Sequence, residues 1–204
     1  MQDSEVINIL QNKFNFRSNS ISDLKIFVEE LLKANRRHNF IAKSTEMNIW
    51  HRHILDSAQL IKFIDFSKGS ISDLGSGAGF PGLILAIFNT NKDFHVKLYE
   101  KSPVKRAFLE EISKKLSIKV QIFGNIYDEI IDSNYIVSRA FKKLDTIIQV
   151  SREIVKKPHK LIILKGQNAQ KDLKKAFKKE KYDYKLENSI TDEGSKIIIV
   201  DFKK

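Results

Sequence analysis

The sequence contains no cysteine, and this absence excludes disulfide bonds, thiolate zinc sites and cysteine nucleophiles. It also lacks a long apolar run: the stretch 83–88 falls far short of the roughly 20 residues that a membrane span needs. The first ten residues are polar and acidic, which is not typical of a signal peptide. We therefore expect a cytoplasmic protein that does not associate with membranes. Separately, we expect a monomer.

Glycine is also scarce, and its distribution is uneven. Of the eight glycines in the chain, four lie between positions 75 and 82. Glycine allows a positive φ and leaves room for a ligand near the backbone. A short β-type run, 71–74, precedes these glycines, and Pro81 with the apolar run 83–88 predicts a helix after them. A strand, a glycine turn and a helix in this order are typical of nucleotide-like ligand sites in α/β sheets.

Positive charge exceeds negative charge. The 36 lysines and arginines outnumber the 25 acidic residues, which gives a net charge of +11. This balance favours an anionic partner, with nucleic acid as the leading candidate. The alternative is compositional bias, because only seven of the 36 basic residues are arginine and such a bias can reflect an AT-rich genome. The densest basic stretch carries Lys171, Lys174, Lys175, Lys178, Lys179 and Lys181, which predicts either phosphate contacts or a solvated helix face.

Hydrophobic periodicity divides the 204 residues into two parts. Residues 1–69 are predicted to be a helical subdomain packed on the core, with one helix over 21–40 and another over 45–65. The second helix is expected to bury Met47, Trp50, Ile54, Leu55, Ala58, Ile61 and Ile64. Residues 70–204 alternate strands (70–74, 95–100, 119–123, 134–140, 159–166, 183–190, 196–202) with helices (80–89, 103–117, 142–156, 168–180) and a short turn or helix at 125–132. This alternation predicts an α/β fold with a mostly parallel seven-stranded sheet, whose last two strands pair antiparallel.

The spacing of the glycine loop separates two functional classes. Residues 77–82 contain GxGxxG, which would indicate a nicotinamide-dependent oxidoreductase, but in that fingerprint the first glycine directly follows the strand. The pattern that does follow the strand, Asp73-x-Gly75-x-Gly77-x-Gly79, resembles the first motif of Rossmann-like class I methyltransferases that use S-adenosylmethionine. Such enzymes need an acidic residue at the end of the next strand for the ribose, and Glu100 stands there. The alternative is a tight structural turn and a surface glutamate.

Further segments resemble the ribosomal RNA small-subunit methyltransferase G family. They keep the family order between about residues 39 and 166: NFI at 39–41, RHILDS at 52–57, GSGAGFPG at 75–82, KRAFL at 105–109, VSRAF at 137–141 and LKG at 164–166. The resemblance implies transfer of a methyl group from S-adenosylmethionine to N7 of one guanine in 16S ribosomal RNA. It also implies cofactor contacts at Gly75, Phe80, Ile126, Tyr127 and Arg139. The family usually has Glu where this chain has Tyr127.

Guanine N7 carries a free lone pair, so its methylation requires no prior deprotonation. We accordingly nominate no general base. The signature of amino-group methylation, Asn/Asp-Pro-Pro-Tyr/Phe, is absent from the fourth strand end, where Ser138-Arg139-Ala140-Phe141 stands. On the substrate side we expect Arg139 and Phe141 to hold the base. Lys165, at the end of the fifth strand, is predicted to contact phosphate.

The RHILDS segment allows two interpretations. His53 and Asp56 share one helix face, which could reach over the cofactor cleft and position the RNA or the glycine loop. Alternatively, Arg52 and Asp56, four residues apart, form a surface ion pair beside a partly buried histidine. A third class, a non-catalytic RNA-binding module, would require only the basic surface. Such a module would bind RNA but have no affinity for the cofactor, whereas the enzyme would bind both.

Overall fold

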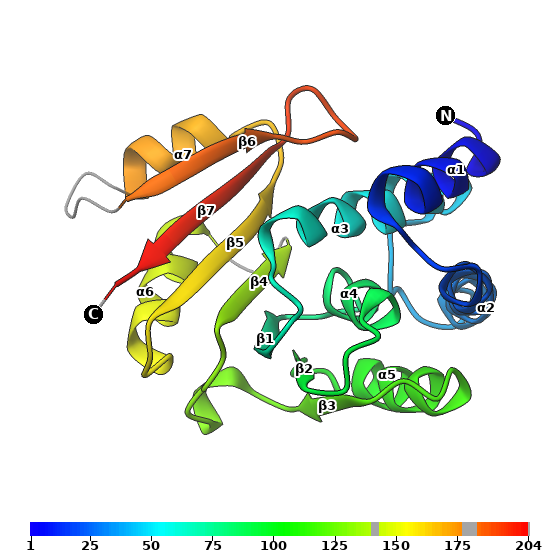
Figure 1. Ribbon diagram of the computed structural model, residues 1–204, viewed down its shortest axis with the longest axis horizontal. Helices are drawn as coiled ribbons and strands as arrows, with labels where there is room; N and C mark the ends of the chain where they lie inside the picture. The colour runs from blue at the N-terminus through cyan, green and yellow to red at the C-terminus, as the bar shows by residue number, and fades with distance from the viewer. Residues whose placement is uncertain (140–142, 177–182, 204) are drawn as a thin grey trace.

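The computed structural model describes the chain except for residues 140–142, 177–182 and 204. Its centre is a seven-stranded sheet in the order β3-β2-β1-β4-β5-β7-β6 (Figure 1). The strands are β1 (Gly69–Leu74), β2 (Phe94–Tyr99), β3 (Val120–Phe123), β4 (Tyr135–Arg139), β5 (His159–Lys165), β6 (Tyr184–Asn188) and β7 (Lys196–Phe202). Strands β1 to β5 pair in parallel, and β7 runs antiparallel to both β5 and β6. The predicted fold class is therefore confirmed.

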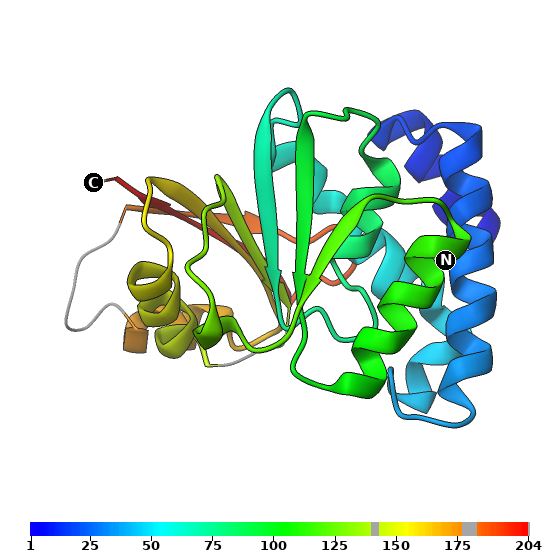
Figure 2. The same cartoon turned by 90° about the horizontal axis from the view of Figure 1, so that it is seen from below.

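Helices cover both faces of the sheet. Helices α4 (Gly82–Phe88) and α5 (Pro103–Lys115) lie on one face, and α6 (Leu144–Ile154) and α7 (Ala169–Ala176) lie on the other (Figure 2). The buried apolar side chains form two clusters, the first on the side of α4 and α5 and the second on the side of α6 and α7. Neighbouring strand residues alternate between them: Val137 belongs to the first and Ile136 to the second. This alternation follows from the period of two in a strand. The predicted helix over 168–180 extends into residues outside the described part of the chain.

The N-terminal helices add a further layer outside α4. Helix α1 (Asp3–Phe14) buries Val6, Leu10 and Phe14, which recur every four residues, and α2 (Ser18–Asn35) buries a similar stripe. These side chains belong to the same cluster as Phe80 and Leu83. The division into units 1–69 and 70–204 stays a prediction. Within the described residues, no helix has the length and apolar character required to cross a membrane.

The segment between residues 43 and 63 differs from its prediction. Instead of one regular helix it forms a 3₁₀ helix (Lys43–Asn48), a π-helix (Trp50–Leu55), the short α3 (Asp56–Ala58) and a second 3₁₀ helix (Gln59–Phe63). The Ser57 hydroxyl donates to the His53 carbonyl at 2.7 Å, a bond that competes with the regular backbone ladder. Met47, which was expected to be buried, is 89% exposed because the 3₁₀ turn changes the period of its face.

The strand order defines where a ligand can bind. Chain connections leave β1 toward β2 on one side and reach β4 on the other, so the order reverses between β1 and β4. Ligands of open α/β sheets bind at the carboxyl ends of the strands beside such a point. The residues that follow β1 and end β4 are the glycine loop and Arg139.

Candidate active site

The glycine loop, residues 75–81, joins β1 to α4. Gly75, Gly77 and Gly79 have φ values of 76°, 58° and 104°, a region that other residues rarely adopt. Pro81 was predicted to lie in the first turn of the helix, but it precedes the helix, which starts at Gly82. The reason is local: the Asp73 carboxylate accepts the N–H of Gly82 at 2.9 Å and thereby caps the helix start.

Six N–H groups in and beside the loop donate within the protein. Tyr99 O accepts two of them, Ser76 O accepts two, and the carboxylates of Glu100 and Asp73 accept one each. The six donors belong to Gly75, Ser76, Gly77, Gly79, Phe80 and Gly82. A dinucleotide-binding loop directs such donors at a pyrophosphate. Here they face inward and a carboxylate lies against the loop, which favours the sulfonium-cofactor interpretation over the nicotinamide one.

Glu100 is suited to hold the ribose of an adenosyl group. Its Oε2 accepts from Gly77 N at 2.9 Å and its Oε1 accepts from Ser102 N at 2.8 Å. Ionised carboxylates have about four lone-pair sites, so acceptor capacity remains for two hydroxyls. A Cβ built on Gly77 would have its nearest neighbour, Gly75 O, at 3.9 Å, which shows open space above the loop at this point. The residues present therefore fit S-adenosylmethionine.

Asp73 lies beneath the loop and is fully buried. Its Oδ2 caps α4, while its Oδ1 has no hydrogen-bond partner among the described residues. Burial raises the pKa of Asp73 to about 7, even though the hydrogen bond from Gly82 acts to lower it. The unpaired oxygen is the feature that fits the predicted contact to the polar end of the cofactor.

Phe80 supports the floor of the site. Its ring is 3% exposed and lies between Phe27, at 5.4 Å between centroids, and His53, stacked at 5.0 Å. The guanidinium carbon of Arg139 lies 4.8 Å from the centroid of the Phe80 ring. The cation and the histidine are thus held against one aromatic ring.

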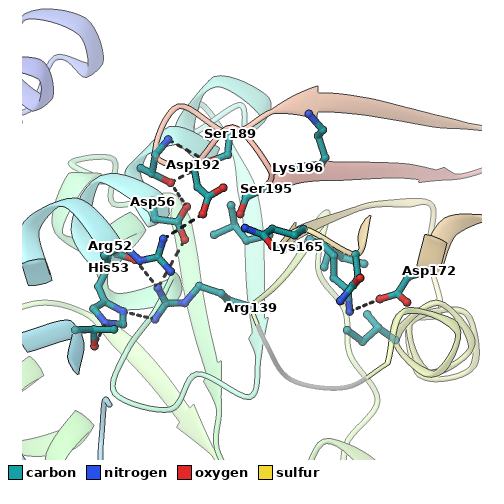
Figure 3. Close-up of a pocket in the computed structure, with 18 residues that line it drawn as sticks. Arg52, His53, Asp56, Arg139, Lys165, Asp172, Ser189, Asp192, Ser195 and Lys196 are labelled. Atoms are coloured by element: carbon teal, nitrogen blue, oxygen red, sulfur yellow. Dashed lines mark hydrogen bonds and ion pairs between the residues drawn. The ribbon is translucent and has the colours of Figure 1, made fainter. Parts of the chain in front are cut away.

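Arg139 ends β4 and is fixed by the 52–56 segment. Its Nη2 lies 2.8 Å from His53 Nδ1, its Nη1 donates to Arg52 O at 3.3 Å, and its Nη1 lies 3.7 Å from Asp56 Oδ2 (Figure 3). Burial, followed by the charge of Arg139, lowers the pKa of His53 to about 3. A neutral ring whose Nδ1 accepts from Arg139 must donate from Nε2, and Thr45 Oγ1 lies 2.8 Å away.

Both interpretations of RHILDS can now be compared with the contacts. Arg52 pairs with Asp192 at 3.3 Å, and Asp56 pairs with Arg139. The predicted Arg52–Asp56 surface pair is thus replaced by two longer-range contacts that join this segment to β4 and to the β6–β7 loop. Through His53 the segment contacts Phe80 of the glycine loop and Arg139 of β4. Its role in positioning the RNA or the glycine loop stays a prediction.

Of the other predicted positions, Ile126 and Tyr127 do not line the cavity that Arg139 and His53 share, whereas Lys165 does. Ile126 is buried at the start of the 3₁₀ helix Ile126–Asp128 after β3, and Tyr127 is 54% exposed with its N–H donating to Asn125 Oδ1 at 3.4 Å. Lys165 ends β5 and pairs with Asp172 at 2.9 Å. Phe141 lies outside the described residues, and its substrate role stays a prediction.

A cavity of about 510 Å³ opens beside Arg139 (Figure 3). Its walls come from the 52–56 segment, the ends of β4 and β5, and the β6–β7 loop, residues 189–195. The lining includes Arg52, His53, Asp56, Arg139, Lys165, Asp172, Ser189, Thr191, Asp192 and Ser195. The glycine loop does not line this cavity. We call the open side of that loop, beside Gly77 and Glu100, the cofactor compartment, and Arg139, which contacts Phe80, lies next to both.

The β6–β7 loop was not predicted as part of the site. Thr191 Oγ1 donates to Asp56 Oδ1 at 2.7 Å, and Gln59 Nε2 donates to Ser189 Oγ at 3.0 Å. A hairpin was expected here, but its nearness to the 52–59 segment depends on the strand order. Because β7 is antiparallel to β5, its first residue pairs with Lys165 at the carboxyl end of β5.

Comparison with known proteins identifies the family. The family model described as rRNA small subunit methyltransferase G matches residues 20–198. The chain belongs to this family. A protein named ribosomal RNA small subunit methyltransferase G from Pelagibacter ubique is 35% identical, with 92% of this chain and 90% of that protein covered. The protein of the same name from Rickettsia felis is 38% identical, with 88% and 92% covered.

Solved structures agree on the fold of this family member. A SAM-dependent methyltransferase from Aquifex aeolicus superposes with a TM-score of 0.58 at 11% identity, covering 76% of this chain and 92% of that one. A precorrin-6y C5,15-methyltransferase from Geobacter metallireducens gives a TM-score of 0.56 at 13% identity, covering 80% and 93%. At these identities the likeness concerns the fold alone, which is Rossmann-like.

Proposed function

We propose that this methyltransferase transfers a methyl group from S-adenosylmethionine to N7 of one guanine in 16S ribosomal RNA. The observation that carries the proposal is the glycine loop in a member of the rRNA small subunit methyltransferase G family. Six N–H groups in and beside this loop donate to acceptors within the protein, and Glu100 lies at its open side. This arrangement suits an uncharged adenosyl group and disfavours a pyrophosphate.

When bound, S-adenosylmethionine supplies the electrophilic methyl group. Glu100 would hold its ribose, and the unpaired oxygen of Asp73 would accept from its polar end. Arg139 is fixed between the loop and the cavity, where it can donate to guanine O6 or support the base. Binding both partners side by side lowers the barrier, by about 7–11 kcal/mol in favourable intramolecular reactions.

The titratable groups of the site agree with attack by a ring nitrogen that carries no proton. His53 is neutral, and both of its ring nitrogens have partners in Arg139 and Thr45. Asp73 is fully buried below the loop, so it cannot reach a base in the cavity. N7 attacks with its lone pair, and the side chains need only hold the base in line with the methyl group.

The substrate and setting follow from charge and composition. The net charge of +11 suits a polyanion, which supports the ribosomal RNA of the small subunit as partner. We further propose that the enzyme acts as a monomer in the cytoplasm, without a membrane partner. A single chain carries every site residue named above, so a second copy is not needed to complete the site. Light scattering of the purified protein would test this.

Two experiments test the proposed function. Calorimetry should show binding of S-adenosylmethionine and none of NAD; the reverse result would favour the oxidoreductase. Small subunits that lack the modification should accept label from S-adenosylmethionine into 16S RNA at low salt. RNA binding without cofactor affinity would instead favour the non-catalytic RNA-binding module.

A further inference from the structure

One wall of the cavity beside Arg139 carries donors and acceptors in sequence. Arg139 borders the cofactor compartment because it rests on Phe80 of the glycine loop. Further along the same wall lies Asp192 of the β6–β7 loop. Arg52 spans the distance between them: its carbonyl accepts from Arg139, and its guanidinium pairs with Asp192 (Figure 3).

Guanine has the complementary arrangement. Its N7 and O6 acceptors share one edge, whereas the N1–H and N2–H donors lie on the far side of the ring. With N7 directed at the cofactor compartment and O6 toward Arg139, the Watson–Crick donors can face the Asp192 carboxylate once the Arg52 guanidinium moves aside. Adenine would place its N1 lone pair against that acceptor and be repelled.

We propose that the Asp192 carboxylate accepts from N1–H and N2–H of the target guanine and thereby selects guanine over other bases. This inference rests on the proposed function. Asp192 becomes a specificity-determining residue, supplied by the β6–β7 loop.

Among the three carboxylates of the cavity, Asp192 is the one best able to take new donors. Asp56 is already occupied, because its Oδ1 accepts from both Thr191 and Gln59 and its Oδ2 faces Arg139. Asp172 is held in a short pair with Lys165, 2.9 Å, on the opposite wall. The Asp192 pair is longer, 3.3 Å, and the side chain of its partner Arg52 is 50% exposed, so Arg52 can move aside.

Asp192 is also oriented before any base enters. Its Oδ1 accepts from Gly194 N at 2.8 Å, which fixes the carboxylate, and this bond is the main cause of a lowered pKa of Asp192. The group is therefore ionised at neutral pH. The tie from Thr191 to Asp56 holds the loop against the 52–59 segment. A pre-oriented acceptor loses little freedom on binding.

The test compares guanine with inosine, which lacks the N2 amino group. Small subunits would be reconstituted with 16S RNA that carries either base at the methylated position. We expect the wild-type protein to prefer guanine in kcat/KM by roughly 10-fold or more, the effect of one lost hydrogen bond to a charged group. In Asp192→Asn this preference should fall close to unity, because the amide offers a single acceptor oxygen.

Two variants separate recognition from structure. Asp172→Asn changes the other cavity carboxylate, and Arg52→Gln breaks the ion pair while leaving the Asp192 carboxylate; both should keep the preference for guanine. If Asp192→Asn lowers both rates equally and keeps the ratio, the residue only holds the loop and the proposal is wrong. A ratio that changes in Asp172→Asn would contradict it as well. Failure of the wild-type protein to methylate guanine-containing subunits would overturn the proposed function together with it.

Discussion

At Gly82 the packing of the site leaves no room for a side chain. A Cβ there would lie 2.7 Å from both Cβ and Oδ2 of Asp73 and would also collide with Leu98. We expect Gly82→Ala to destabilise the protein by about 1–3 kcal/mol through overpacking, which corresponds to about 2–4 °C in Tm for each kcal/mol. Gly166→Ala is the matched control, since a Cβ there has no neighbour within 4 Å. Thermal unfolding of both variants checks the prediction, and equal Tm values would contradict it.

Glu100 is the single residue that we expect to contribute most to the affinity for S-adenosylmethionine. In Glu100→Gln, the amide keeps one acceptor oxygen but turns an N–H₂ group toward a backbone N–H that needs an acceptor. We expect the Kd for S-adenosylmethionine to rise roughly tenfold or more, since hydrogen bonds to charged groups contribute about 1.5–3 kcal/mol. Glu110→Gln, on the exposed face of α5, should bind as the wild type does. Calorimetry of both decides, and unchanged affinity in the first variant would remove Glu100 from the site.

At the scale of elements, the 52–56 segment and the end of β4 act as one unit through Arg139. Arg139→Ala would leave Asp56 without its cation and His53 Nδ1 without its donor, so we expect a loss of stability of about 3–5 kcal/mol as well as of activity. The sequence alone, which does not reveal these contacts, predicts that Arg139→Ala damages methyl transfer more than stability. Arg139→Lys keeps the charge but not the paired donors, and should reduce methyl transfer more than Tm. Unfolding and turnover measured on both variants would show this, and full activity in the lysine variant would exclude the role.

His53 makes this unit sensitive to acid. Its pKa is about 3 in the folded protein and near 6.5 when unfolded, so the unfolded chain binds the proton first as pH falls. Its stabilising contribution is present above pH 6.5 and is lost toward pH 3, with a slope of up to about 1.4 kcal/mol per pH unit. The raised pKa of Asp73 gives a pH dependence of the opposite sign, but this contribution is the same in the wild-type protein and in His53→Gln, so it cancels in the comparison. Urea unfolding between pH 4.5 and 7.5 should give a smaller slope for His53→Gln, and parallel curves would contradict the assignment.

The sequence predicts elements well where the pattern is local. All seven strands and the antiparallel tail follow from alternating apolar runs and a hairpin connection. The 43–63 segment does not form the single regular helix predicted, because a serine back-bond competes with the helix ladder, although Trp50 and Ile54 are buried as predicted. The β6–β7 wall of the cavity was also missed, since its nearness to Asp56 depends on strand order. The inward-facing loop donors depend on Tyr99, which lies on another strand.

For the whole molecule, the excess of 11 positive charges predicts strong salt dependence of RNA binding. Each phosphate that the protein neutralises releases counterions from the RNA, so log K falls linearly with log salt concentration, with a slope of about −0.7 per contact for single strands. We expect affinity for the small subunit to fall by tenfold or more between low and physiological salt. Filter binding across a salt series measures the slope, and a flat line would show that charge is not what binds the RNA.

The central claim is a methyl group placed on N7 of one guanine of 16S RNA. Its most direct test is mass spectrometry of nucleosides and nuclease fragments from unmodified small subunits incubated with the protein and S-adenosylmethionine. The account predicts 7-methylguanosine at a single position in the wild-type reaction and much less with Glu100→Gln. A methyl group on an exocyclic amine, on ribose or on no nucleotide of the 16S RNA would contradict it.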